Sequence, residues 1–130
     1  MLYTVRIKSN KDFTRLYNKG FFVSCGICTV YYRKNGKNIN RIGISTGKKI
    51  GNAVKRSRAR RVIRQAYREC EKDFPVGFDM IVAARAGSVS CKSYNVVSFF
   101  KGRVIPHMKD PSRKKPVRKS NDTGKNQRNN

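Results

Sequence analysis

Hydrophobic and polar residues follow two different periods along the first part of the chain. After Ser9, a residue type favoured at helix N-caps, three apolar residues recur at helical spacing as far as Gly20: Phe13, Leu16 and Tyr17. This spacing predicts a short first helix. Residues 21–32 are rich in β-branched and aromatic residues and predict a strand, or two strands if the stretch is split.

The next part of the chain carries a turn signal between two strand-like stretches. Asn35-Gly36 is a dipeptide typical of tight turns, and residues 40–46 then predict the returning strand of a hairpin. Further along, residues 78–84 form a nearly continuous apolar run, which predicts a buried strand.

Two more helices complete the predicted order. The longer one covers about residues 53–72 and ends before Pro75, and the last covers about residues 90–100 with an extension toward Val104. The resulting order is helix, strand, strand, helix, strand, helix. It favours an α/β fold, an α+β sandwich in which helices pack on a mixed β-sheet.

Composition divides the chain into a body and a tail. Residues 109–130 are dominated by basic and small polar residues, with Val117 as the only aliphatic one. Such a segment buries too little apolar surface to offset its ordering entropy, so we expect a disordered basic tail after one folded domain at residues 1–108. The tail holds eight of the 31 Lys and Arg residues, so most of the positive charge belongs to the body.

Charge narrows the class of partner. The formal net charge of +24 over 130 residues predicts binding to a polyanion, either nucleic acid or an acidic membrane surface. No run approaches 18 apolar residues, and residues 1–10 lack the apolar core of a secretory signal. We therefore expect a cytoplasmic protein with no membrane partner.

The predicted long helix is basic on one side and apolar on the other. A helical projection gathers six residues on one face: Ala59, Val62, Ile63, Ala66, Tyr67 and Cys70. Basic residues cover the rest of the helix: Lys55, Arg56, Arg58, Arg60, Arg61, Arg64, Arg68 and Lys72. A merely solvated helix would interleave Glu with Lys, but Glu69 and Glu71 stand only at its end. The pattern indicates a surface for phosphate groups, which the guanidinium fork binds in bidentate fashion.

Among polyanions, RNA fits this helix best. An interfacial membrane helix needs bulky apolar residues such as Trp, Phe or Leu opposite its basic side, and this helix offers Ala, Val, Ile and Tyr. No short helix-turn-helix pair is apparent, and arginines along the whole helix suit backbone contacts better than base reading. Recognition of RNA by shape is the remaining interpretation.

Aromatic residues suggest a second site. Phe13 and Tyr17 are neighbours on the first helix, and either Tyr31 or Tyr32 must face outward from its strand. Aromatic rings beside basic side chains stack on unpaired bases. From spacing alone, a stacking surface and a simple packing role are equally good interpretations.

Catalytic and metal-binding residues are scarce. His107 is the only histidine, the carboxylates are scattered, and residues 47–51 lack the spacing of a phosphate-binding Walker loop. Cys25 and Cys28 have the spacing of half a zinc site, but no second pair accompanies them. We therefore expect no catalytic residue in this chain, and structural or free thiols in preference to a metal site.

Residues 41–65 carry a resemblance to a known family. They read RIGISTGKKIGNAVKRSRARRVIRQ, which resembles the signature of the ribonuclease P protein subunit: R-[IV]-G, then K-K-x-G-x-A-V, then R-N-R-x-[KR]-R-x-x-R. The resemblance extends over roughly residues 5–100. One departure is Ser57, which stands where the family usually has Asn; serine still donates to phosphate but has a shorter reach.

The resemblance implies a fold and a partner. The family fold is like the second domain of ribosomal protein S5, with a left-handed βαβ crossover. The partner is ribonuclease P RNA, which uses Mg2+ to remove the 5′ leader from precursor tRNA, so this chain would be the accessory subunit of an endonuclease, a hydrolase of tRNA processing, with no small-molecule substrate. By similarity, the residues that contact the catalytic RNA are Lys48, Lys49, Lys55, Arg56, Ser57, Arg58, Arg60, Arg61, Arg64 and Arg68. Those that bind the leader are Phe13, Tyr17 and Tyr31, in a cleft between the first helix and the sheet.

Two other functions remain open from the sequence. A structural ribosomal protein or RNA chaperone would bind many RNAs with little preference. A protein-only ribonuclease would cleave without an RNA cofactor, although the absence of clustered carboxylates counts against it.

Overall fold

The computed structural model describes residues 4–110. Along the chain, the strands and helices are β1 (Thr4–Arg6), α1 (Asn10–Lys19), β2 (Phe21–Ser24), β3 (Cys28–Lys34), β4 (Asn40–Ser45), α2 (Ala53–Cys70), β5 (Phe78–Ala84), α3 (Ser93–Phe99) and α4 (Ile105–Lys109). Short helical turns lie between them: η1 (Lys48–Ile50), η2 (Glu71–Asp73), η3 (Ala86–Val89) and the π-turn η4 (Phe100–Val104). Within the described range, no helix is long and apolar enough to span a membrane. The predicted tail lies outside the described residues, apart from its first two.

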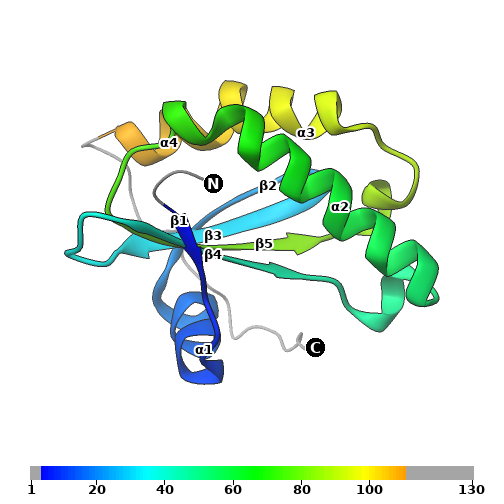
Figure 1. Cartoon of the computed structure of the whole chain (residues 1–130), viewed down its shortest axis with the longest axis horizontal. Coiled ribbons are helices and arrows are strands. Elements are labelled where there is room, and N and C mark those ends of the chain that lie inside the picture. The colour runs from blue at the N-terminus through cyan, green and yellow to red at the C-terminus, as the bar shows by residue number, and fades with distance from the viewer. Residues whose placement is uncertain (1–3, 111–130) are drawn as a thin grey trace.

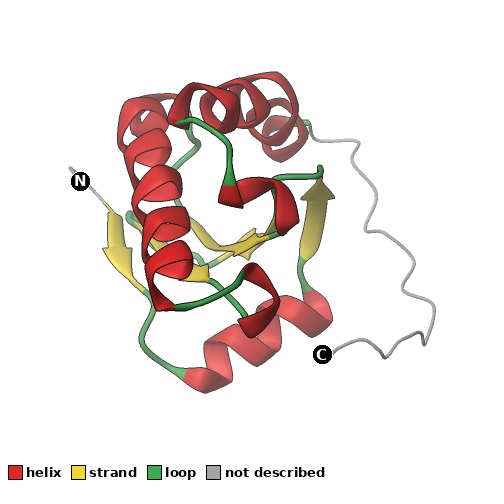
Figure 2. Ribbon diagram, turned by 90° about the vertical axis from the view of Figure 1, so that its right-hand side faces the viewer, coloured by secondary structure: helices red, strands yellow, loops and turns green. Residues whose placement is uncertain are grey.

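The five strands form one mixed sheet in the order β1-β4-β5-β3-β2. The central strand β5 pairs antiparallel with β3 and parallel with β4, and β1 is a parallel edge strand beside β4. Helix α1 covers one face, while α2, α3 and α4 cover the other (Figures 1 and 2). The predicted α+β sandwich with a mixed sheet is confirmed.

The connection from β4 through α2 to β5 is a parallel β-α-β unit. In Figure 1, the sheet is seen nearly edge-on, with β1 and β4 nearest the viewer and α2 above the strands. Passing over the sheet from β4 to β5 then gives the left-handed crossover that the family resemblance implies, the rare hand for such units.

The predicted hairpin between residues 21–32 and 40–46 is wrong, because β5 lies between β3 and β4. Two asparagines explain the arrangement. The buried Asn40 side chain accepts from the amides of Gly77 and Phe78 at 2.8 and 2.9 Å, which fixes the start of β5 beside β4. On the other side, the backbone amide of Asn35 donates to the Gly77 carbonyl at 2.8 Å.

Smaller differences concern the ends of elements. Residues 21–32 are split, as the sequence allowed, into the antiparallel pair β2 and β3 around Gly26. Strand β1, with only three residues, was not predicted. The last helix begins at Ser93 rather than about residue 90, and it continues through η4 into α4.

Each face of the sheet has its own apolar core. On the α2 side, Met80 and Val82 of β5 pack with Ile63 and Tyr67 of α2 and with the apolar side of α3 and α4. The cluster on the α1 side is much smaller. It consists of Ile81 of β5, Leu16 of α1 and Ile7, which follows β1. The small cluster leaves aromatic residues of α1 and β3 only partly covered.

Candidate nucleic-acid interface

Helix α2 begins directly after a glycine-flanked lysine turn. The side chain of Asn52 caps the helix by accepting from the amide of Lys55 at 3.0 Å. Gly51 has a φ of 133°, a backbone conformation that glycine adopts without strain. In η1, Ile50 is buried and leaves Lys48 and Lys49 exposed. The sequence therefore places a lysine pair at the start of the arginine-bearing helix.

The two sides of α2 are as predicted. Five of the six apolar residues are buried and Val62 is half-buried against the core. The predicted RNA contacts lie outside this stripe: Lys55, Arg61 and Arg68 are exposed, and Arg56, Ser57, Arg58, Arg60 and Arg64 are half-buried. None of the ion pairs among residues 4–110 involves a basic residue of α2. The positive charge of this helix is therefore not neutralised by carboxylates of the described chain.

Two of the predicted RNA contacts bind parts of the protein itself. Arg60 donates to the hydroxyl of Thr46, just after β4, at 2.7 Å. Arg58 donates to three backbone carbonyls in the segment after β5, those of Ser88, Val89 and Cys91. The acceptors are neutral, so both guanidinium groups keep their charge uncompensated.

On the other face of the sheet, α1 packs over β3 and β5, and its Phe13 side chain reaches β4. The ring of Phe13 lies against Gly43, where an added Cβ would come within 2.6 Å of the tip of the ring. Any larger residue at this position would have to displace the Phe13 ring. Phe13, predicted to line a leader site, is half-buried and packs against the small core, as Tyr17 and Tyr31 also do, and its part in a leader site stays a prediction.

Tyr17, in the last turn of α1, contacts Tyr31 of β3. Their ring centroids are 4.8 Å apart with an interplanar angle of 79°, an edge-to-face pair. Burial raises the pKa of Tyr17, opposed in part by a hydrogen bond with Ser45 of β4. Both residues are half-buried and remain partly accessible to solvent.

Phe22 belongs to the same aromatic surface and was not predicted. It lies opposite Tyr31 in the β2–β3 pairing, with ring centroids 5.9 Å apart. The sequence does contain the signal, because residues paired across a hairpin share a face. The register became evident only once residues 21–32 were known to form two strands. Tyr17, Tyr31 and Phe22 are called the aromatic surface below.

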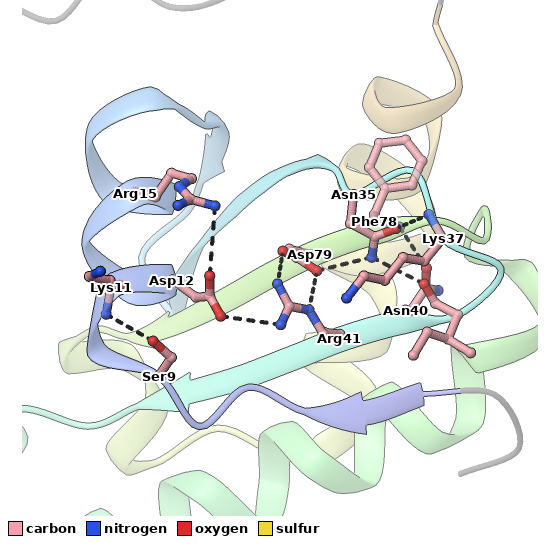
Figure 3. Close-up of polar contacts among 11 residues, drawn as sticks. Ser9, Lys11, Asp12, Arg15, Asn35, Lys37, Asn40, Arg41, Phe78 and Asp79 are labelled. Carbon is pink, nitrogen blue, oxygen red and sulfur yellow. Dashed lines mark hydrogen bonds and ion pairs between the residues drawn. The ribbon is translucent and has the colours of Figure 1, made fainter.

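A polar network fixes α1 on the sheet (Figure 3). Arg41 donates to both oxygens of Asp79, at 2.8 and 2.6 Å, and to Asp12 of α1 at 3.1 Å. Asn35 donates to Asp79 at 3.0 Å. Burial alone would raise the pKa of Asp79, but these hydrogen bonds together outweigh burial and hold that pKa below its ordinary value.

The predicted N-cap of α1 is confirmed, since Ser9 accepts from the amide of Lys11. The carboxylate of Asp12, three residues after Ser9, binds Arg41. Arg41 and Gly43 both belong to the R-[IV]-G part of the sequence motif. In this structure both residues contact α1: Arg41 binds Asp12, and Gly43 lies against the ring of Phe13.

Groups able to do chemistry are few in the described range. The Nδ1 atom of His107 is hydrogen-bonded to the hydroxyl of the buried Tyr32, so the histidine braces α4 against β3. Cys25 and Cys28 flank the β2–β3 turn, and burial raises the pKa of Cys28 strongly. Among residues 4–110, no group of three or more His, Cys, Asp or Glu side chains is placed to hold a metal ion. The interpretation of these thiols as structural stays a prediction.

The chain is similar to proteins of a known family. The family model described as Ribonuclease P matches residues 1–102. A curated relative, the ribonuclease P protein component of Clostridium botulinum (strain Loch Maree / Type A3), is 39% identical over 84 residues, covering 64% of this chain and 76% of the relative.

Solved structures agree with the sequence comparison. The RNase P protein of Staphylococcus aureus superposes with a TM-score of 0.67 at 33% identity, covering 76% of this chain and 91% of that one. The RNase P protein of Thermotoga maritima superposes with a TM-score of 0.71 at 24% identity, covering 81% and 98%, and supports the fold alone.

Proposed function

Because the chain belongs to the ribonuclease P protein family, we propose that it is the protein subunit of a ribonuclease P ribonucleoprotein, an endoribonuclease of tRNA processing. In this proposal it binds ribonuclease P RNA through α2 and η1, and it binds the 5′ leader of precursor tRNA through the aromatic surface. It thereby promotes removal of the leader in the cytoplasm.

The observation that carries the proposal is the unneutralised basic side of α2. Like charges stacked along a helix destabilise it by a few tenths of a kcal/mol per pair, and this chain supplies no carboxylate partners for them in residues 4–110. RNA phosphates would supply the missing charge. The residues proposed to contact the catalytic RNA directly are Lys48, Lys49, Lys55, Arg56, Ser57, Arg60, Arg61, Arg64 and Arg68.

The aromatic surface supports the second part of the proposal. The half-buried Tyr17–Tyr31 pair makes an edge-to-face contact, and the ring of Phe22 lies beside that of Tyr31. A base of the leader stacked on such a surface gains about 1–3 kcal/mol. Ser45 and Thr46 are consecutive residues, and they bind Tyr17 on one side of the sheet and Arg60 on the other. Two adjacent residues at the end of β4 thus each contact one residue of a proposed RNA site, from opposite faces of the sheet.

Catalysis is assigned to the RNA. The carboxylates of Asp12 and Asp79 are engaged by Arg41, and the donor sets of residues 4–110 do not fit a metal ion. In the proposal the RNA subunit would bind Mg2+, and the ion would activate a water molecule as the nucleophile for phosphodiester hydrolysis. This chain screens phosphate repulsion between two RNAs and holds the leader.

The experiment that tests the RNA assignment compares two RNAs at several salt concentrations. Affinity of the full chain for a bacterial ribonuclease P RNA is measured beside affinity for an unrelated folded RNA of equal length. Because phosphate contacts without shape recognition are lost as salt rises, we expect the ribonuclease P RNA to be preferred increasingly at higher salt. Equal affinities at every salt concentration would instead identify a general RNA chaperone.

A further inference from the structure

Arg58 stands in the middle of the family motif but points at the protein. Its Nη1 atom donates to the carbonyls of Ser88 and Val89, at 3.4 and 3.0 Å, and its Nη2 atom donates to the carbonyl of Cys91 at 2.8 Å. Backbone carbonyls of a partly buried turn require donors, and here one guanidinium supplies them for three residues. The fork of an arginine reaches all three, whereas a lysine ammonium is a single point of charge.

The segment held by Arg58 supports other parts of the molecule. Turn η3 packs against α2 and against η1, the turn that carries Lys48 and Lys49. On its other side, the amide of Gly87 donates to the carbonyl of Gly26 in the β2–β3 turn at 3.0 Å. The approach is close, because a Cβ on Gly87 would come within 2.7 Å of that carbonyl oxygen. Turn η3 therefore lies between the β2–β3 turn and η1 and contacts both.

We propose that Arg58 is a positioning residue: by holding η3 it sets the place of η1 and so of Lys48 and Lys49, and it does not itself bind the RNA. This inference rests on the proposed function, in which the lysine pair contacts ribonuclease P RNA. It separates the motif into two kinds of arginine. Arg61 and Arg68 are exposed with no ion-pair partner among residues 4–110, whereas Arg58 acts through the protein.

The test is a double-mutant cycle read as affinity of the full chain for a bacterial ribonuclease P RNA. Arg58→Ala is made in the wild-type chain and in a Lys48→Ala/Lys49→Ala chain. We expect a loss of about tenfold in the first background, within the usual range for residues of one network, and less than about twofold in the second. Arg61→Ala, the control for direct contact, is expected to lose the same factor in both backgrounds. An equal loss for Arg58→Ala in both would overturn the proposal.

Two more variants keep the test decisive if Arg58→Ala folds poorly. Arg58→Lys keeps the charge but not the fork, so it should behave like Arg58→Ala, whereas near-wild-type affinity would indicate a direct phosphate contact. Gly87→Ala displaces η3 from the β2–β3 turn without touching Arg58, and it should reproduce the same dependence on the lysine pair. Full affinity of Gly87→Ala would show that the place of η3 does not matter.

Hydrogen exchange of the free protein provides a readout without RNA. The amides of Ile50 and Gly51 close η1 by donating to Gly47 and Lys48, each at 3.1 Å. They should exchange faster in Arg58→Ala than in wild type, and at the wild-type rate in Arg61→Ala. Unchanged exchange in Arg58→Ala would contradict the proposal. Because this measurement needs no RNA, it separates failure of this inference from failure of the proposed function, which would show as absent binding by the wild-type chain.

Discussion

At the level of single residues, two ion pairs of this protein differ in what they contribute. Asp79 is 11% exposed at its side chain and accepts from Arg41 through both oxygens, at 2.8 and 2.6 Å. Asp73 and Lys101 are 56% and 55% exposed and lie 3.8 Å apart. Solvent screens the Asp73–Lys101 pair. Loss of Asp79, by contrast, would leave the largely buried guanidinium of Arg41 without one of its carboxylate partners.

Asp79→Ala should therefore lower the free energy of unfolding by about 3 kcal/mol, and Asp73→Ala by less than about 1 kcal/mol. Urea denaturation near neutral pH measures both. Losses of equal size would show that the Arg41 network does not hold α1 as described.

The Asp79 carboxylate makes the stability of the fold depend on pH, with a sign that follows from the shift of its pKa. Its pKa in the folded protein lies below the ordinary value, so its charged form stabilises the fold fully above the pKa of the unfolded chain. This stabilisation is lost as pH falls through the folded pKa. The stability difference between wild type and Asp79→Ala should accordingly shrink below about pH 4; a difference that stays constant there would argue against it.

At the level of elements, α1 and the aromatic surface form one unit. Tyr31 projects from β3 on the face that α1 partly covers, and Tyr17 meets it from the helix. Tyr94 lies on α3 at the other face of the sheet. It is 67% exposed and does not belong to the aromatic surface.

Tyr31→Ala should weaken binding of leader-bearing precursor tRNA by the assembled enzyme by about 1–3 kcal/mol, and leave binding of mature tRNA as it was. Tyr94→Ala is the matched control and should change neither. Equal losses for precursor and mature tRNA would place the contact of Tyr31 outside the leader.

Helix α2 is the element on which RNA binding depends in this account. Replacing Arg61, Arg64 and Arg68 together by Ala should flatten the dependence of log affinity on log salt by about 0.7–0.9 per lost phosphate contact. A triple variant of equal charge, with Ala at Lys101, Arg103 and Lys109, serves as control. Titrations of ribonuclease P RNA at several salt concentrations measure the slope. Equal slopes for the two variants would contradict the proposal that the arginines of α2 contact RNA phosphates.

The elements also show what the sequence could and could not predict. Long periodic segments such as α2, and the apolar run of β5, were predicted with nearly their observed bounds, because each buries a face that its own residues define. The strand order was not, since it depends on Asn35 and Asn40 binding the start of β5 from either side. A buried asparagine 40 residues into the chain carries no local sign of its distant partner.

The same limit applied to the candidate site. The basic side of α2 was evident from periodicity, but the direction in which each arginine points was not. Arg58 and Arg61 look alike in the motif, and only the folded chain distinguishes the one that binds carbonyls after β5. Phe22 joined the aromatic surface through the β2–β3 register, which the sequence left open.

On the scale of the whole molecule, the sheet separates two proposed RNA sites. Helices α2 and α1 lie on opposite faces of the sheet (Figure 1). The basic residues belong to α2 and the aromatic surface to the α1 side, and the end of β4 contacts Arg60 on one face and Tyr17 on the other. Such an arrangement suits a protein that joins a catalytic RNA to the single-stranded end of its substrate.

Cleavage of precursor tRNA at low magnesium concentration tests this account most directly. Three reactions are compared: the protein alone, a bacterial ribonuclease P RNA alone, and the two together. We expect strong cleavage only in the mixture, with a mature 5′ end as product. Cleavage by the protein alone would make this chain a nuclease, and a mixture no faster than the RNA alone would contradict its role as the subunit that promotes removal of the leader.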